Sequence, residues 1–185
     1  MKHVDYTAKL RLPAMLLGDD QAETKGPYFK PSIYKKVFKP LYSELTRHAH
    51  SKGVKIILHS DGRFKTGNPK DPKNEGWDFI DECIIDQGID AWHSVEMGAN
   101  NVHEIKEHVK DRLALIGSMD TEWFQHYGPE KVRYLVYKHL KGFLKRGGLH
   151  GFIPGTDNSI ISSTRIESWL SMTRTIDDFS KKYIK

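Results

Sequence analysis

The chain has 185 residues and a net charge of +5, with 38% hydrophobic and 29% charged residues. This length predicts one globular domain with its own core, and no apolar stretch approaches the roughly 20 residues that a membrane-spanning helix needs. The lysines are spread along the chain without a basic stripe interleaved with aromatic residues, so nucleic acid is not expected as a partner. The single cysteine excludes an internal disulfide, and the lack of an apolar signal core favours a cytoplasmic protein.

Five short apolar runs alternate with segments of helical periodicity. The runs cover residues 14–18, 54–58, 89–92, 113–117 and 150–155, and each ends in a group of polar side chains. Alternation of strand, polar loop and helix is typical of a parallel α/β fold. In such folds the carboxyl ends of the strands carry the chemistry, so the five polar groups are the candidate site of an enzyme.

The intervening segments predict five helices. The first is expected to begin after Lys30-Pro31 with Ser32 as its N-cap and to be kinked by Pro40. Its apolar face is predicted from a four-residue repeat. The repeat comprises Ile33, Val37, Leu41, Leu45 and Ala49. The other helices are expected at 77–87, from Asn101, from Pro129 to Gly147, and from Thr164. Thr164 and Glu167 have capping-box spacing.

One polar segment rich in Pro and Gly, residues 64–76, directly follows the second apolar run. A segment of this kind is either a mobile surface excursion or a lid over a site. Cys83, within the predicted second helix, is interpreted as a core residue.

His59 is the strongest candidate for a functional residue, because an imidazole at the end of an apolar strand can project into a site. It is interpreted as a metal ligand, a polar contact to substrate or a structural residue. A metal set of His59, Asp61 and Glu96 is predicted, since imidazole and carboxylate are adequate zinc ligands. The catalytic candidates are Asp20, His59 and Glu96, and the candidate substrate contacts are Asp19, His93, Asp120 and Asn158.

Several of these residues also have a structural interpretation. Asp19 and Asp20 form a pair of carboxylates that either orient substrate and donate a proton or cap the following turn. Glu96 is interpreted as a metal ligand or a general base. His93 is equally compatible with simple packing in its strand.

From about Leu16 to Tyr183 the chain resembles the C-terminal part of the uroporphyrinogen decarboxylase superfamily. This superfamily includes the decarboxylases of tetrapyrrole biosynthesis and the cobalamin- and coenzyme M-linked methyltransferases. The segments that carry the resemblance are 18–21 followed by 25–27 and 30–32, 38–42, 53–62 with His59 at the strand end, 88–92, 115–120, 147–148 and 154–160. The resemblance implies a (β/α)8 barrel of roughly twice this length, with this chain as its last five βα units and the first three missing.

In the methyltransferase branch the residue matching His59 helps to hold a zinc ion that binds a thiol. The branch has His-x-Cys where this chain has His59-Ser60-Asp61, and residues 151–160 contain no cysteine. Where the decarboxylase branch has a histidine in its last loop, this chain has Asn158. The missing cysteines argue against a thiolate-rich zinc site, and the missing histidine argues against a decarboxylase. By this resemblance the retained His59 with its flanking carboxylates favours metal-assisted methyl transfer from a corrinoid or other methylated donor to a thiol.

Two alternatives stay open from the sequence. One is decarboxylation of a tetrapyrrole carboxylate, and the other is an inactive fragment or a module that only binds a corrinoid or tetrapyrrole. The expected partners are a small-molecule substrate and a corrinoid protein. A five-unit piece leaves sheet edges exposed, so a second copy or a separate chain is expected to complete the barrel.

Overall fold

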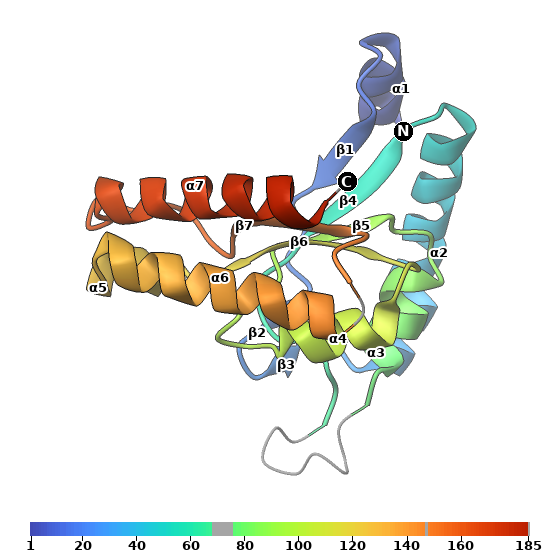
Figure 1. The fold of residues 1–185 in the computed structure, drawn as a ribbon. Helices are drawn as coiled ribbons and strands as arrows, with labels where there is room; N and C mark the ends of the chain where they lie inside the picture. The colour runs from blue at the N-terminus through green and yellow to red at the C-terminus, as the bar shows by residue number, and fades with distance from the viewer. Residues whose placement is uncertain (68–75, 147, 185) are drawn as a thin grey trace.

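The computed structural model describes residues 1–67, 76–146 and 148–184. A five-stranded parallel sheet forms its centre, with the strands in chain order, β1-β4-β5-β6-β7 (Figure 1). The α/β class expected from the sequence is confirmed. The five strands are β1 (Ala14–Leu17), β4 (Lys55–His59), β5 (Ala91–His93), β6 (Ala114–Met119) and β7 (Phe152–Thr156), and β2 (Ala22–Glu23) pairs antiparallel with β3 (Gly26–Pro27).

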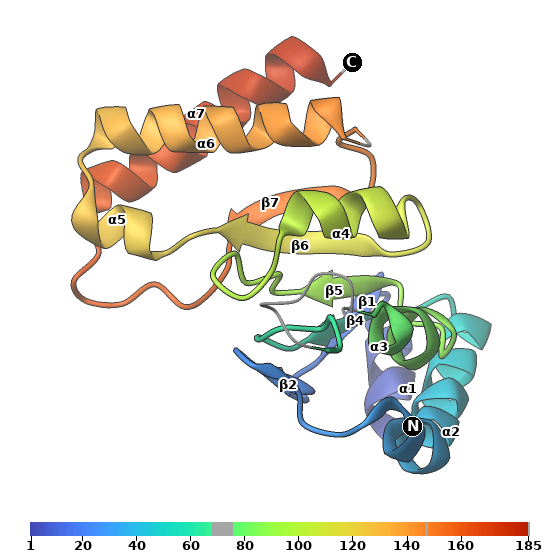
Figure 2. The same cartoon turned by 90° about the horizontal axis from the view of Figure 1, so that it is seen from below.

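Helices connect the parallel strands. In both views α6 and α7 lie side by side along the later strands (Figures 1 and 2). No helix in the described part of the chain is long and apolar enough to cross a membrane. The helices are α1 (Lys2–Lys9), α2 (Pro31–Ser51), α3 (Asp78–Ile80), the π-helical turn η2 (Asp81–Ile85), α4 (Val102–Val109), α5 (Glu122–His126), α6 (Pro129–Lys145) and α7 (Ile166–Tyr183).

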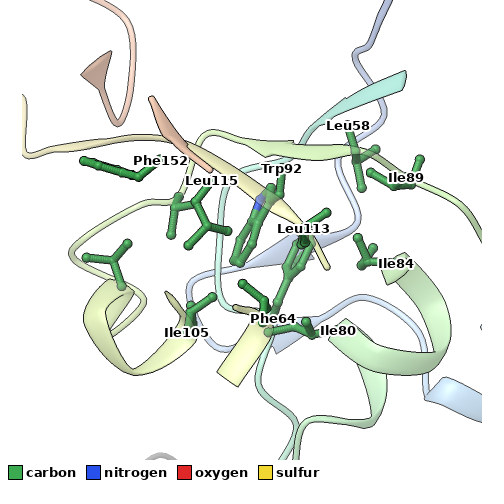
Figure 3. Packing of buried hydrophobic residues seen from close by; sticks show 14 of the residues in the cluster. Leu58, Phe64, Ile80, Ile84, Ile89, Trp92, Ile105, Leu113, Leu115 and Phe152 are labelled. Carbon is green, nitrogen blue, oxygen red and sulfur yellow. The ribbon is translucent and has the colours of Figure 1, made fainter. Parts of the chain in front are cut away.

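The two faces of the sheet differ in how well they are covered. The strand register places Leu58, Trp92 and Leu115 in one row, and all three are buried against the helices. Trp92 stacks on Phe64 with ring centroids 4.0 Å apart (Figure 3). The opposite face, here called the open face, carries His59, His93, Ile116 and Ile153 in one row across β4 to β7, with Leu16 and Ile57 in the next row.

The predicted apolar face of α2 is only partly right. Ala49 is buried and Leu45 partly buried, but Ile33, Val37 and Leu41 are exposed. A second four-residue repeat, 34, 38 and 42, faces the core instead, where the Tyr34 ring packs on those of Phe38, Tyr42 and Phe79. Tyr34 is fully buried, and Phe38 and Tyr42 are partly buried. The aromatic row packs on the core because its rings remove more apolar area from water than the aliphatic row does.

The helix termini correct two further expectations and confirm a third, the helix start near Asn101. Lys30, not Ser32, is the N-cap of α2, because Pro31 occupies the first helical position. Arg165, not Thr164, precedes α7, and the hydroxyl of Thr164 has no hydrogen-bond partner among the described residues. Asn101 does cap α4, where its side chain accepts a hydrogen bond from the Glu104 N–H.

The segment predicted as the second helix is a single turn that continues as the π-helical turn η2. Cys83 is buried there, as predicted. Most of the segment interpreted as a lid or surface excursion, 68–75, lies outside the described residues. At its two ends Thr66 and Gly76 pair through backbone hydrogen bonds of 3.0 and 2.9 Å.

Candidate functional site at the carboxyl ends of the strands

Two histidines lie next to each other on the open face of the sheet. His59 ends β4 and His93 ends β5, and the parallel register pairs them directly. Their Nδ1 atoms are 2.8 Å apart, so one ring donates a hydrogen bond to the other. Burial, and then the neighbouring His59, lower the pKa of His93. A His93 that stays neutral is able to accept the bond from His59.

Asp20, His59 and Asp61 form a compact group of metal-ligand side chains. One ligand atom from each lies within 4.8 Å of the others. Ligand atoms about 2.0–2.2 Å from a zinc ion are at most roughly 4.4 Å apart. The 4.8 Å within which the three atoms lie is slightly wider than this limit, and Asp20 is the exposed member of the group.

Close packing of two loops holds Asp20 beside Asp61. The backbone N–H of Gln21 donates to Ser60 Oγ at 2.8 Å, and that of Arg63 donates to the Glu23 carbonyl at 2.9 Å. Gly62 has a φ of +85°, and a Cβ there would lie 2.7 Å from the carbonyl carbon of Ala22. Only glycine permits this approach, so Gly62 is required for the geometry of the cluster.

Ser94 connects Asp61 to the far side of the site. Its buried hydroxyl donates to Asp61 Oδ1 at 2.7 Å and also lies in a very short contact with the backbone carbonyl of Asp157. A hydroxyl has one proton, which these two acceptors share. Asp61 is thereby fixed in orientation by the loop that follows β5.

Asp157, in the loop after β7, is buried and joins three loops. Its Oδ1 accepts from the Thr121 N–H at 3.1 Å, and its Oδ2 accepts from the Met97 N–H at 3.2 Å. Burial raises the pKa of this carboxyl group, although the two backbone donors oppose the shift. The side chain stabilises the loops after β5, β6 and β7 as one unit.

Glu96 supports the site from outside the three-residue cluster. Its carboxylate accepts from the Gly62 N–H at 2.9 Å, and Asn100 bonds the backbone carbonyls of both Gly62 and Glu96. The predicted metal set of His59, Asp61 and Glu96 thus differs from the group that the described residues form, in which Asp20 takes the place of Glu96.

The remaining predicted residues have local partners. Asp19 accepts a hydrogen bond of 2.8 Å from the Tyr42 hydroxyl. Asp120 accepts from the Glu122 N–H at the start of α5, and burial raises the pKa of its carboxyl group. Asn158 is exposed and accepts from the N–H of its neighbour Ser159. Of these three, Asp120 combines a position at the strand ends with a perturbed pKa, which favours a functional role.

Sequence reasoning missed Ser94 and Asp157. Both lie within the polar groups that follow the apolar runs, next to His93 and Asn158. The alternation of side chains along a strand does not extend into the loop after it, so the sequence did not show which member of each group turns inward. In the structure Asp157 is buried, while Asn158 is exposed.

No protein-family model matches the chain, and a comparison with curated proteins gives no match. Among solved structures, the fold is similar to that of a sugar phosphate isomerase/epimerase from Parabacteroides distasonis ATCC 8503, with a TM-score of 0.53 and 13% sequence identity. The match covers 96% of this chain and 62% of that one. At this identity the likeness shows a barrel-like α/β fold and nothing about activity. This chain spans less than two thirds of its neighbour's length.

Proposed function

We propose that the chain forms the last five βα units of a (β/α)8 barrel of the uroporphyrinogen decarboxylase type. Its activity in this proposal is metal-assisted methyl transfer from a corrinoid or other methylated donor to a thiol. The observation that carries the proposal is the cluster of Asp20, His59 and Asp61 at the carboxyl ends of neighbouring strands. The resemblance in sequence supplies the reaction class.

The donor set fits a zinc ion. One imidazole and two carboxylates are ligands that zinc accepts, and three protein ligands with an open position are the usual arrangement of catalytic zinc sites. When bound, zinc would lower the pKa of a substrate thiol, so that the thiol is present as its thiolate at neutral pH.

The surrounding residues support this role. A ligating histidine commonly donates its second ring N–H to a fixed acceptor. His93, 2.8 Å from His59 Nδ1 and with a lowered pKa, supplies that acceptor. Nε2 of His59 is then the nitrogen left for a ligand. Ser94 orients Asp61 in the same way through the bond to its Oδ1.

The thiolate would attack the methyl group of the donor. A carbon–sulfur bond forms while the bond from carbon to the donor breaks, and its electron pair stays on the donor. A corrinoid-carrying protein would present the methyl group at the open strand ends. Glu96 and Asp120, in the loops after β5 and β6, are available to accept the proton of the thiol.

Decarboxylation of a tetrapyrrole carboxylate has less support from the geometry. Its substrate carries several carboxylates, whereas the charged side chains gathered at the strand ends include Asp19, Asp20, Asp61, Glu96 and Asp120. Like charges repel in such a site. A purely binding role for a corrinoid or tetrapyrrole is the non-enzymatic alternative, and it makes no use of the buried partners of His59 and Asp61.

The sugar phosphate isomerase/epimerase neighbour suggests a second candidate. A divalent ion beside a carboxylate base also suits proton transfer next to a sugar carbonyl. The specific observation in its favour is Asp120, a carboxyl group with a raised pKa at the strand ends.

Metal content and thiol methylation together test the proposal. We expect the purified chain to hold zinc with a stoichiometry near one and to methylate a small thiol from methylcobalamin. His59→Ala should abolish both. His126→Ala is the matched control, because His126 is exposed and pairs with Glu122, one turn away on α5.

Zinc retained at full stoichiometry in His59→Ala would overturn the assignment of the metal site. Zinc binding without methyl transfer, combined with turnover of a phosphorylated sugar, would favour the second candidate. Corrinoid binding that is equal in the parent and in His59→Ala, with no turnover, would favour the binding role.

A further inference from the structure

A second candidate site lies between α4 and α6, away from the His59 cluster. A cavity of about 550 Å³ opens there, which is within the range of small-molecule sites. Its walls come from the first turn of α4, from α5 and from one face of α6. The lining of the cavity includes His103, Trp123, Lys138, His139, Lys145 and Arg146.

A glycine brings the two helices close together at this cavity. A Cβ on Gly142 would overlap the imidazole of His103, only 2.7 Å from its Cε1. His103 Nε2 donates to the His139 backbone carbonyl at 3.0 Å, and its ring packs against Phe143 with centroids 4.7 Å apart. These contacts fix the position of the His103 ring in the cavity wall, which favours a preformed binding site.

The described lining of the cavity is positively charged. Lys138, Lys141, Lys145 and Arg146 belong to it, and among the described residues no Asp or Glu does. Lys141 is held over the Tyr183 ring at 4.5 Å. No ion pair is recorded for the other three cations within residues 1–67, 76–146 and 148–184. Like charges on one helix face repel each other, and a bound anion would relieve that repulsion.

Neutral groups with aromatic surface form the inner wall of the cavity. His139 is buried, burial lowers its pKa to about 3, and its Nε2 lies 3.0 Å from Ser118 Oγ. It is uncharged at neutral pH and does not compete with the lysines for an anion. The Trp123 ring lies nearby, 6.2 Å from that of His139, and offers a planar apolar surface.

We propose that this cavity binds a phosphate ester that carries a planar ring. The phosphate would pair with Lys138, Lys145 and Arg146, since lysine and arginine are the side chains that most often hold phosphate oxygens. The ring would pack against Trp123. The site is independent of the His59 cluster, so the proposal stands whatever reaction that cluster supports.

Calorimetric titration of the full chain with adenosine 5′-monophosphate tests the proposal, with adenosine and inorganic phosphate as the two partial ligands. We expect the monophosphate to bind at least tenfold more tightly than either partial ligand. Lys145→Glu should weaken its binding at least tenfold. Lys131→Glu should change it less than twofold, because Lys131 is exposed on the same helix and does not line the cavity.

Trp123→Phe reports on the ring separately, and it should reduce the ligand-induced change in tryptophan fluorescence. Equal binding to the parent and to Lys145→Glu would overturn the proposal. Inorganic phosphate that binds as tightly as the monophosphate would overturn the part assigned to the ring. Binding to anionic phosphatidylglycerol vesicles without binding of the monophosphate would overturn it in favour of a lipid headgroup.

Discussion

The carboxylate of Asp157 accepts a backbone hydrogen bond from each of two loops, those after β5 and β6. These loops carry the residues that surround His59 and Asp61, so one buried side chain controls the shape of the site. Removing a buried acceptor leaves its donors unsatisfied, which costs more than the bond itself contributes. This cost in free energy is largest where both carboxylate oxygens accept hydrogen bonds, as those of Asp157 do.

We expect Asp157→Asn to lower the free energy of unfolding by roughly 1–3 kcal/mol. The amide keeps one acceptor oxygen but turns its NH₂ group toward the second backbone donor. Urea denaturation at neutral pH measures the change. Asp178→Asn, at an exposed position on α7, is the control and should change stability little. Equal effects of the two substitutions would show that Asp157 does not join the loops.

The buried His139 leads us to expect that the folded chain loses stability in acid. Burial, and then the neighbouring His103, lower its pKa from 6.5 to about 3, so between these two values the unfolded chain binds more protons than the folded chain. The stability that depends on neutral His139 is fully present above pH 6.5 and is lost as pH falls toward 3. Each unit by which the pH falls within this window lowers the free energy of unfolding by about 1.4 kcal/mol.

In His139→Gln this dependence should flatten. The amide can still bond Ser118 but does not titrate. Urea midpoints between pH 4 and 7 measure the slope, and His126→Gln, which changes an exposed histidine, should retain the slope of the parent. A slope that is unchanged in His139→Gln would contradict the assignment.

At the scale of elements, periodicity predicted the five parallel strands and most of the helices, but not α1 or α5, and not which helix face is buried. In α2 the aliphatic and the aromatic repeats are both compatible with the pattern, and only the packing of Tyr34 against Phe79 on a distant segment decides between them. The helix caps were mispredicted for a related reason. Pro31 and Arg165 set the local backbone at those two helix starts, and the side chains of Ser32 and Thr164 do not cap them.

The candidate site was also predictable only in part. Its residues were predictable as polar groups after apolar runs, because parallel strands bring their carboxyl ends to one edge. The pairing of His59 with His93 depends on register, and the proximity of Asp20 to Asp61 depends on Gly62 and its loop. These are long-range properties that periodicity does not contain.

The contact between α4 and α6 predicts that replacing a glycine by alanine changes the free energy of unfolding in the direction opposite to the usual one. Alanine normally stabilises a helix interior by about 1 kcal/mol relative to glycine. Gly142→Ala should nevertheless destabilise the chain, because its Cβ would overlap the His103 ring. In a His103→Ala background the same substitution should become stabilising. Urea midpoints of the four chains measure the cycle, and stabilisation in both backgrounds would contradict the close packing.

At the scale of the whole molecule, the sheet buries one face more completely than the other. Within the part of the chain that the structure describes, β1 and β7 each have a neighbouring strand on one side only. Leu16 and Ile153, on the open face at these two edges, are each 55% exposed. Unpaired strand edges beside apolar side chains favour association, and completion by further strands is the proposal that explains both features.

We therefore expect the purified chain to associate through its open face, with light scattering after size exclusion giving the mass of a dimer. Leu16→Lys together with Ile153→Lys should shift the mass to that of a single chain, because two desolvated lysines cost more than the apolar contact contributes. Leu41→Lys is the control: Leu41 is 64% exposed but lies on α2, away from the open face. A parent chain that stays monomeric at high concentration would show that the open face needs no second copy. Loss of the dimer in Leu41→Lys alone would place the contact on the helices.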